Sequence, residues 1–260
     1  MTRGLWNRET VALMLVAAYL PLALFWLWSG GAEAVARLGL VVLVIGVWHL
    51  VFMLVRAQAP SLSGLIAGLA IAMLAPEDLG AARMVLGISF GVVMGELVFG
   101  GWGRNVVNPA TITLSFLGFG FPAFGWPVFD PPVAWAAIPA IAIGLALGVM
   151  PAALLAGAVL AGAAAVAAGL VGGQVVLMAG IVLVLLVADP VTGAATTLGR
   201  WAHGALYAAL VTLFANGWGG AAPVQIAVAA ALLASLAAPL LDEAALSIWL
   251  AKRRRRHGRT

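Results

Sequence analysis

The feature that most constrains this chain is its succession of long apolar runs with almost no charge between them, from residue 11 to residue 241. An α-helix needs about 20 apolar residues to cross the hydrocarbon part of a bilayer. Of the 260 residues, 64% are hydrophobic and only 8% are charged, whereas a soluble domain carries about 25% charged residues. The sequence therefore predicts an all-α integral membrane protein.

The boundaries of the apolar runs predict about ten membrane crossings or partial crossings. Residues 29–37 form an expected loop, Ala59 and Pro60 break the chain, and the piece after them is too short to span without tilt. The expected helices cover residues 11–28, 38–55, 62–74, 84–99, 109–120, 133–150, 152–170, 175–187, 201–214 and 224–241.

An even number of crossings places both termini on one side. Six of the thirteen basic residues lie within residues 252–259, and the positive-inside rule makes that side cytoplasmic. We expect a multi-pass protein of the inner (cytoplasmic) membrane with both termini in the cytoplasm. The acidic residues Glu77, Asp78 and Asp130 then face the other side.

A short echo suggests internal symmetry. The string GGWG at residues 100–103 returns as GWGG at residues 217–220, five expected helices later and on the opposite side. Two inverted five-helix repeats would produce that placement. The expected organisation is a single polytopic domain with a first repeat at 1–125, a second at 126–241 and a basic cytoplasmic tail at 242–260.

Composition excludes several kinds of chemistry. The absence of cysteine rules out thiolate metal sites, iron–sulfur clusters and cysteine nucleophiles, and no metal site is expected. Walker, HExxH and GxSxG motifs are missing, so hydrolytic and nucleoside-triphosphate chemistry has no support. The net charge of +4 lies largely in the tail, so no nucleic-acid partner is expected, and redox chemistry would need an organic cofactor.

The first candidate site is the loop at residues 100–110, GGWGRNVVNPA, which joins two apolar helices. Glycines such as Gly101 and Gly103 allow positive φ and close approach of a ligand. Arg104, Asn105 and Asn108 add charge and hydrogen-bonding groups. The loop is either a ligand-binding element or only a connection between two helices, in which case Arg104 serves to set the orientation of the protein in the membrane.

The second candidate site is the loop at residues 189–200, DPVTGAATTLGR. Asp189 ends one helix, and Thr192, Thr196 and Thr197 either cap the next helix or bind a ligand. In the predicted alternation both loops open to the cytoplasm, so they could share one ligand.

Two ionisable residues lie inside expected helices. Glu96 is the only carboxylate within an apolar run, and such groups commonly mark ion or proton pathways. It also lies near its helix end, so it could instead reach water or pair with Arg104. His49 is either a buried neutral histidine bonded to a carbonyl or part of a proton or ion path.

Three segments resemble the NqrB/RnfD membrane subunits of the sodium-pumping NADH:quinone reductase and the Rnf ferredoxin:NAD complexes. The run GGWGRNVVNPATITLSFLGFGFP resembles that family's GGxGxNxxNPA segment. The run VADPVTGAATTLGRWAHGALYAALVTLF is similar to its ATDPVSAATT–GR–YGALIG segment. The closing LLASLAAPLLDEAALSIWLAKRR resembles the family's ending, where an N–APL–D motif precedes a basic tail.

This resemblance implies a fold of two inverted five-helix repeats, similar to urea and ammonium transporters, and a flavin-carrying electron-transfer subunit. Relatives attach FMN to a threonine in a (D)xxSGAT motif between the fifth and sixth helices. Residues 121–132 contain no threonine or serine, and the nearest string, DPVTGAA, has Ala195 at the acceptor position. The resemblance therefore implies a noncovalent flavin, riboflavin or FMN, and no covalent FMN is expected.

The first functional hypothesis is an electron-transfer subunit of a multi-subunit oxidoreductase. A flavin held by the two loops would exchange electrons with a quinone or a partner, and the partners would be other membrane subunits and membrane lipid. The second hypothesis is a channel or transporter for a small neutral or vitamin-like solute on the same fold. The third is a structural subunit that lost the cofactor, so whether the chain is an enzyme stays open.

Overall fold

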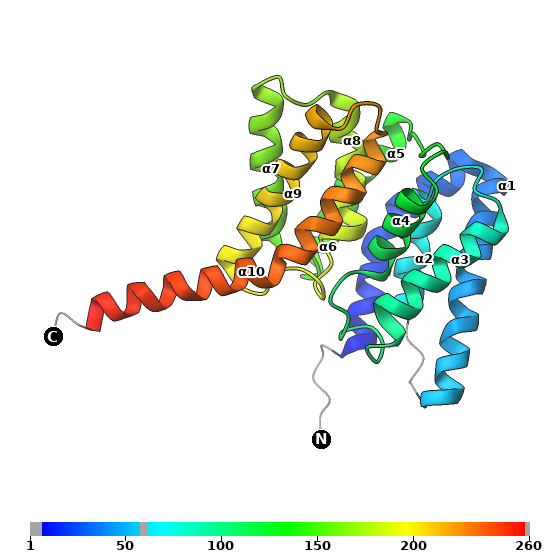
Figure 1. The fold of residues 1–260 in the computed structure, drawn as a ribbon, viewed down its shortest axis with the longest axis horizontal. Coiled ribbons are helices and arrows are strands. Elements are labelled where there is room, and N and C mark those ends of the chain that lie inside the picture. The colour runs from blue at the N-terminus through cyan, green and yellow to red at the C-terminus, as the bar shows by residue number, and fades with distance from the viewer. Residues whose placement is uncertain (1–6, 58–61, 258–260) are drawn as a thin grey trace.

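The computed structural model describes residues 7–57 and 62–257, with side chains described up to residue 254. Every regular element in those residues is a helix, which confirms the all-α prediction for them (Figure 1). The predicted break at Ala59 and Pro60 lies outside the described residues. The elements in chain order are α1 (Arg8–Arg56), α2 (Ser63–Leu74), α3 (Ala81–Val92), η1 (Val93–Leu97), α4 (Pro109–Gly120), α5 (Pro131–Trp135), α6 (Ala137–Ala146), α7 (Ala152–Ala167), α8 (Gly173–Val182), η2 (Leu183–Val187), α9 (Thr197–Gly217) and α10 (Pro223–His257), where η marks a π-helical turn.

The expected loop at residues 29–37 is wrong. Helical structure continues through it, and α1 is broken only at Gly31, whose φ of 56° and ψ of −139° are non-helical. Glycine adopts such angles without steric cost, so one residue suffices to reverse the helix direction. The two arms of α1 consequently run in opposite directions, up to the kink and back again (Figure 1).

Three other expected boundaries also need correction. The expected helix 133–150 is two helices, α5 and α6, and α9 begins at Thr197, four residues before its expected start. The tail expected from residue 242 is helical, because α10 continues without a break to His257. Hydropathy alone misses this continuation, since the last turns of α10 are strongly basic.

Successive elements run alternately between two ends of the bundle (Figure 1). The turns after η1 and η2 share the end at which the described chain begins, and we call it the loop end. The turns between α2 and α3 and between α4 and α5 lie at the other end, where the amide of Glu77 donates to the carbonyl of Gly125 at 2.8 Å. We call this the acidic end, after its carboxylates Glu33, Glu77, Asp78 and Asp130.

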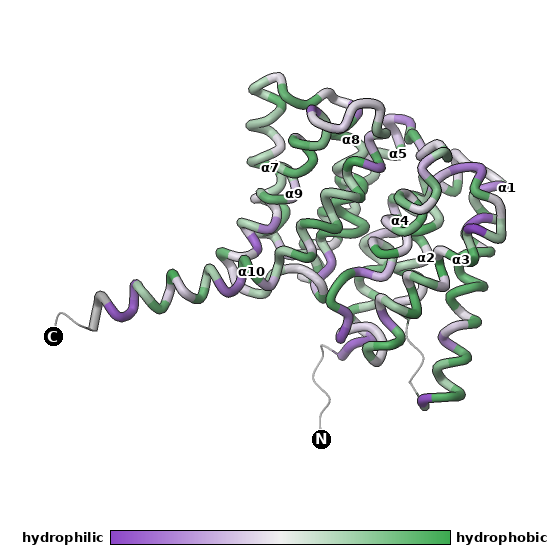
Figure 2. Tube along the Cα trace, viewed as in Figure 1, coloured by the Kyte–Doolittle hydropathy of each residue, from purple (hydrophilic) through white to green (hydrophobic). Residues whose placement is uncertain are grey.

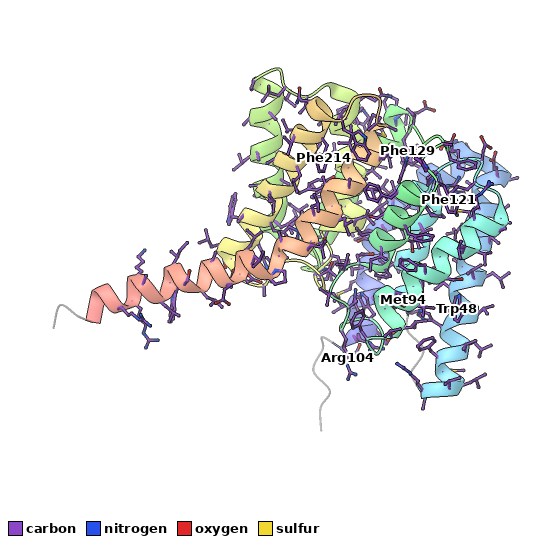
Figure 3. All side chains as sticks on the ribbon, in the orientation of Figure 1. Trp48, Met94, Arg104, Phe121, Phe129 and Phe214 are labelled. Atoms are coloured by element: carbon purple, nitrogen blue, oxygen red, sulfur yellow. The ribbon has the colours of Figure 1, made fainter. Side chains whose placement is uncertain are left out.

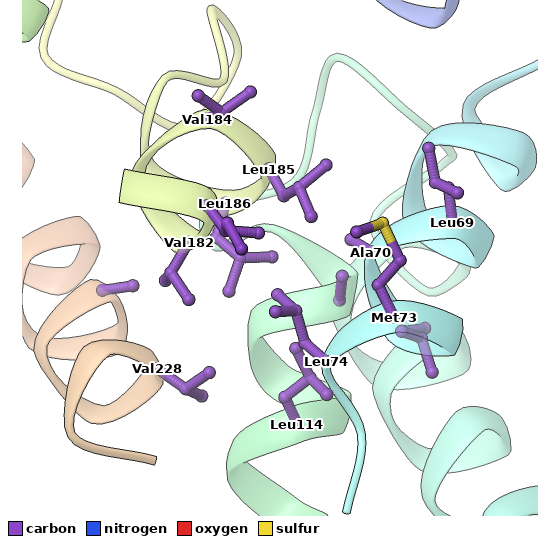
Figure 4. Packing of buried hydrophobic residues seen from close by; sticks show 14 of the residues in the cluster. Leu69, Ala70, Met73, Leu74, Leu114, Val182, Val184, Leu185, Leu186 and Val228 are labelled. Carbon is purple, nitrogen blue, oxygen red and sulfur yellow. The ribbon is translucent and has the colours of Figure 1, made fainter. Parts of the chain in front are cut away.

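The middle of the bundle is a close-packed apolar layer (Figure 4). It is built by α2, α4, α8, η2 and α10, and Ile71, Leu74, Leu114, Leu185 and Leu186 in it have no more than 1% of their surface exposed. Because α2 and α4 have 12 residues each, each is about 18 Å long. They therefore reach only part of the way across a bilayer core of about 30 Å.

Hydrophobic residues predominate along most of the helices (Figure 2), and many large apolar side chains lie exposed on the outside of the bundle. Leu24, Leu43, Leu54 and Leu240 each have between 62% and 74% of their surface exposed. An apolar exterior of this extent is typical of helices that face lipid. Within the described residues, α1 and the stretch Pro223–Arg254 of α10 are the two helices long and apolar enough to cross a membrane. The ten crossings and the two inverted repeats stay predictions.

Helices α7 and α9 approach each other so closely that their backbones touch. A Cβ atom at Gly204 would collide with the carbonyl oxygen of Leu154, and one at Gly157 would collide with the carbonyl oxygen of Trp201. Backbone atoms cannot move aside as a side chain does, so these glycines set the distance between the two helices. Small residues at such contacts are a general device of helix packing in membranes.

Gly204→Ala is therefore expected to lower the free energy of unfolding by about 1–3 kcal/mol, the usual cost of overpacking. Thermal melting of the detergent-purified protein measures the effect. Gly162→Ala in α7 is the control, because a Cβ there meets nothing within 4 Å, and alanine favours helix by about 1 kcal/mol. Equal melting temperatures for the two variants would contradict this view of the α7–α9 contact.

Candidate functional site

The first polar loop begins where the π-helical turn η1 ends. The amide of Val98 donates to the carbonyl of Val93 at 3.0 Å, a bond across five residues that widens the last turn of the helix. Gly100, Gly101 and Gly103 then have φ values of 101°, 91° and 94°, which confirms the expected positive φ. The chain folds back on itself there and stays at the loop end.

The asparagines of this loop hold its own backbone. Asn105 Oδ1 accepts from the amide of Gly103 at 3.1 Å, and Asn105 Nδ2 donates to the carbonyl of Val107 at 3.4 Å. Asn108 Oδ1 accepts from the amide of Ala110 at 2.9 Å and so caps α4. Both side chains are buried.

The second polar loop repeats this arrangement. It follows η2, where the amide of Ala188 donates to the carbonyl of Leu183 at 2.8 Å, again across five residues. Asp189 comes next and is 4% exposed. Its carboxylate accepts from the amide of Val191 at 2.9 Å and from the hydroxyl of Thr192 at 3.1 Å.

A single hydrogen bond joins the two loops. Asn108 Nδ2 donates to Asp189 Oδ2 at 3.2 Å across 81 residues of sequence, in a fully buried position. The prediction that both loops lie at the same end is confirmed by this contact. Burial raises the pKa of the Asp189 carboxyl above its ordinary value, while the hydrogen bonds from Val191, Thr192 and Asn108 act in the opposite direction.

Asp242 of α10 is a site residue that the sequence analysis did not select. It accepts from the amides of Ala195 and Thr196 at 2.7 and 2.8 Å, and from the hydroxyl of Thr196 at 2.6 Å. The same hydroxyl accepts from the amide of Gly199 and caps α9. The APLLD string before the basic tail was the available signal for Asp242, since it was part of the family resemblance.

The remaining predicted residues lie on the outside of the loops. Arg104 is exposed at the loop end (Figure 3), and its side chain folds over Gly100. Thr197 is exposed in the first turn of α9. Arg200 is half-buried, and its Nε donates to the carbonyl of Ala194 at 3.1 Å.

Glu96 and His49 come together inside the bundle. Glu96 lies in η1, is 1% exposed, and accepts from the hydroxyl of Ser63 at 2.8 Å. His49 Nε2 lies 3.8 Å from Glu96 Oε1 and has no hydrogen bond within the described part of the chain. The sequence analysis considered Arg104 as the partner of Glu96, but Ser63 and His49 occupy that position.

A second buried histidine lies beside the second loop. His203 of α9 is 0% exposed, and its Nδ1 accepts from the amide of Ala194 at 3.3 Å. Nearby, a cavity of about 170 Å³ is lined by Gly148–Ala152 and by Asp189, Pro190, Gly193, Ala194 and Arg200. Neither His203 nor this cavity was expected from the sequence.

The acidic end carries a different polar cavity. A volume of about 310 Å³ is lined by Glu33, Glu77, Asp78 and Asp130 together with Arg37. The guanidinium of Arg37 donates to the carbonyls of Ala75 and Pro76 and so fixes the turn after α2. Glu77, Asp78 and Asp130 do lie opposite the two polar loops, as the charge pattern predicted.

The sequence is similar to those of known membrane-complex subunits. Residues 5–131 match the model of the NQR2, RnfD, RnfE family, a range that includes the first loop but ends before the second. The B subunit of the Na(+)-translocating NADH-quinone reductase from Yersinia pestis is 38% identical over 93 residues, which are 36% of this chain and 22% of that protein.

The B subunits of the same reductase from two further organisms are also similar to this chain. The protein from Stutzerimonas stutzeri is 30% identical over 106 residues, or 40% of this chain and 26% of the relative. The protein from Pseudomonas paraeruginosa is 36% identical over 77 residues, or 30% and 19%. The matched segments thus span about a quarter of the length of these curated relatives, or less.

Asp189→Ala tests whether the two loops depend on each other. The substitution leaves the buried amide of Asn108 and the hydroxyl of Thr192 without their acceptor, and each such loss costs about 1–3 kcal/mol. We expect a clearly lower melting temperature and faster proteolysis within residues 98–108 and 188–196. Asp130→Ala, which removes an exposed carboxylate at the acidic end, is the control. If the first loop of Asp189→Ala resists proteolysis as well as it does in the wild type, the two loops are independent of each other.

Proposed function

We propose, from the match of residues 5–131 to the NQR2, RnfD, RnfE family, that the chain is a multi-pass membrane subunit of an NADH:quinone or Rnf-type oxidoreductase complex. Its role there is electron transfer, with other membrane subunits as partners and a quinone or a partner as electron acceptor or donor. The proposal places it in the inner membrane, with the loop end and both termini toward the cytoplasm. The names of the relatives support membership of such a complex. The hydrogen bond between the two loops supports a functional site at the loop end.

The observation that carries the proposal is the junction of the two loops. Two segments in different halves of the sequence meet through Asn108 and Asp189 at one end of an apolar bundle. Each is entered through a π-helical turn, a feature that is common at functional sites. Buried polar groups are costly unless they are hydrogen-bonded, and the groups of this junction are paired with one another and with the loop backbone.

A noncovalent flavin at this junction would need free polar side chains and a cavity of sufficient volume. The side chains of Asn105, Asn108, Asp189, Thr192 and Thr196 are bonded to the loops themselves or to α10. The cavity beside the second loop, about 170 Å³, is smaller than the ~300–1,000 Å³ of typical small-molecule sites. These five side chains hold the loops in place, and we propose that a flavin binds outside the space that they enclose.

We place such a ligand on the outer surface of the loop pair. Arg104 and Thr197 are exposed there, and the glycines of the first loop leave backbone within reach of a ligand. We propose that Arg104 holds an anionic edge of the flavin and that a neighbouring subunit covers its other side. A bound flavin would supply one- and two-electron redox chemistry at this position.

The pair of Glu96 and His49 is proposed as part of a proton or ion path that opens at the loop end. The 3.8 Å between Glu96 Oε1 and His49 Nε2 exceeds hydrogen-bond length, so a proton would pass through a bridging water or after a small side-chain shift. Ser63 holds the carboxylate in place meanwhile. A buried carboxylate in a membrane bundle is costly enough that a functional reason is the default.

The alternative function, passage of a small neutral solute, requires a path through the bundle. The apolar layer of α2, α4 and η2 fills the centre between the two polar ends (Figure 4). A polar solute would have to displace side chains such as Leu74 and Leu186, which are fully buried. The packing therefore favours electron transfer over transport.

The flavin is tested by absorption and fluorescence of the detergent-purified protein, alone and within its native complex, before and after acid precipitation. We expect flavin in the supernatant, because the acceptor threonine is absent from residues 121–132. Arg104→Ala is expected to reduce flavin retention without changing the melting temperature, since the side chain is exposed.

Each other result contradicts a stated part of this proposal. Flavin in the acid pellet would mean covalent attachment. Unchanged flavin content in Arg104→Ala would remove Arg104 from the site, and Arg83→Ala, which removes an exposed arginine from the start of α3 at the acidic end, serves as the matched control. A native complex without flavin in either fraction would reject the flavin role.

Glu96→Gln tests the proton or ion path in vesicles that contain the assembled complex. The amide keeps the hydrogen bond with Ser63 but carries no charge, so we expect ion or proton uptake per electron to fall strongly. The melting temperature should stay close to that of the wild type. Asp130→Asn at the acidic end provides the comparison for a carboxylate outside the path, and unaltered uptake in Glu96→Gln would exclude this residue.

A further inference from the structure

The last turns of α10 leave the bundle and project sideways away from its other helices (Figure 1). The change in direction follows Pro239, which lies inside α10 and cannot donate the regular helical hydrogen bond. We call residues 243–254, which follow Asp242, the α10 extension. At about 1.5 Å per residue it is some 18 Å long.

Large apolar side chains of the α10 extension lie uncovered. Leu246, Ile248, Trp249 and Leu250 are 48%, 57%, 54% and 45% exposed. In Figure 3 the side chains along this part of α10 stand clear of the other helices. A helix with this much uncovered apolar surface requires an apolar environment of its own.

Most of that surface is one stripe that ends in positive charge. Leu246, Trp249, Leu250 and Arg253 stand at positions i, i+3, i+4 and i+7, so they share one side of the helix. The guanidinium of Arg253 lies 5.3 Å from the centre of the Trp249 ring, which gives the stripe an apolar body and a charged tip. Lys252 and Arg254 flank that tip, and the sequence continues with two more arginines.

We propose that the α10 extension lies in the headgroup region of the membrane at the loop end and binds anionic phospholipid there. The Leu246–Trp249–Leu250 stripe would enter the boundary between headgroups and acyl chains. Lys252, Arg253 and Arg254 would pair with lipid phosphates. The proposal goes beyond the electron-transfer role and does not depend on a flavin.

Charge and side-chain type together favour a lipid surface over a protein partner. Tryptophan is enriched at membrane–water interfaces, because its ring is apolar and its N–H is polar. A cluster of basic residues directly after a membrane helix is typical of binding to anionic lipid, and long basic side chains can reach the headgroups from a buried helix. The extension begins after Asp242, which holds the second loop, so the start of the extension is fixed at the loop end.

The test uses the full-length protein, which contains no cysteine, so one introduced cysteine carries a polarity-sensitive dye. Leu250→Cys places the dye on the stripe. The labelled protein is reconstituted into nanodiscs of phosphatidylcholine containing nitroxide-labelled lipid, with or without phosphatidylglycerol. We expect blue-shifted emission and strong nitroxide quenching with phosphatidylglycerol, and much weaker quenching without it or in high salt.

Replacing the charges should release the extension. Each basic side chain contributes roughly a fivefold factor at an anionic surface. In Leu250→Cys carrying Lys252→Gln, Arg253→Gln and Arg254→Gln, the ratio of docked to released extension should therefore fall roughly a hundredfold. Leu240→Cys, on the same helix before the extension and 72% exposed, is the control and should be quenched equally in both lipid mixtures.

Two results would overturn the proposal. Equal quenching of the Leu250→Cys label in both lipid mixtures would mean that charge has no part in docking. Emission typical of water in both mixtures would mean that the extension stands away from the bilayer, where a protein partner could bind it instead.

Discussion

The hydrogen bond between Asn108 and Asp189 is the contact on which the loop end depends. A buried carboxylate in an apolar bundle is tolerated only when donors surround it, and here two come from its own loop and the third from the other half of the chain. Asn108 meanwhile caps α4, and Asp242 holds the end of the second loop on α10. Two groups of satisfied polar contacts, one around Asp189 and one around Asp242, therefore hold the helices together at this end.

Local signals made much of this arrangement predictable. Glycines indicated the positive φ values of the first loop, and the Asn-Pro pair indicated the start of α4. Alternation of apolar runs and charge indicated that the two polar loops share an end opposite Glu77, Asp78 and Asp130. Each of these inferences rests on a local property of the sequence, which can be recognised without knowledge of the fold.

Other parts depend on contacts that no local pattern encodes. The pairing of Asn108 with Asp189 and of Glu96 with His49 joins residues that are far apart in sequence, and Asp242 looked like part of a tail until its three hydrogen bonds were seen. The kink at Gly31 was taken for a loop because hydropathy falls there for several residues, although a single glycine makes the turn. Sequence identified these residue types and predicted a ligand-binding role for them, and the structure shows that most of them also hold the loops.

The two π-helical turns have a geometric consequence of their own. A π-turn amounts to one additional residue within an α-helix, and one residue corresponds to about 100° of rotation around the helix axis. Everything after Val93 and after Leu183 is thus rotated relative to a regular helix, so both polar loops leave their helices in a direction that a regular helix would not give.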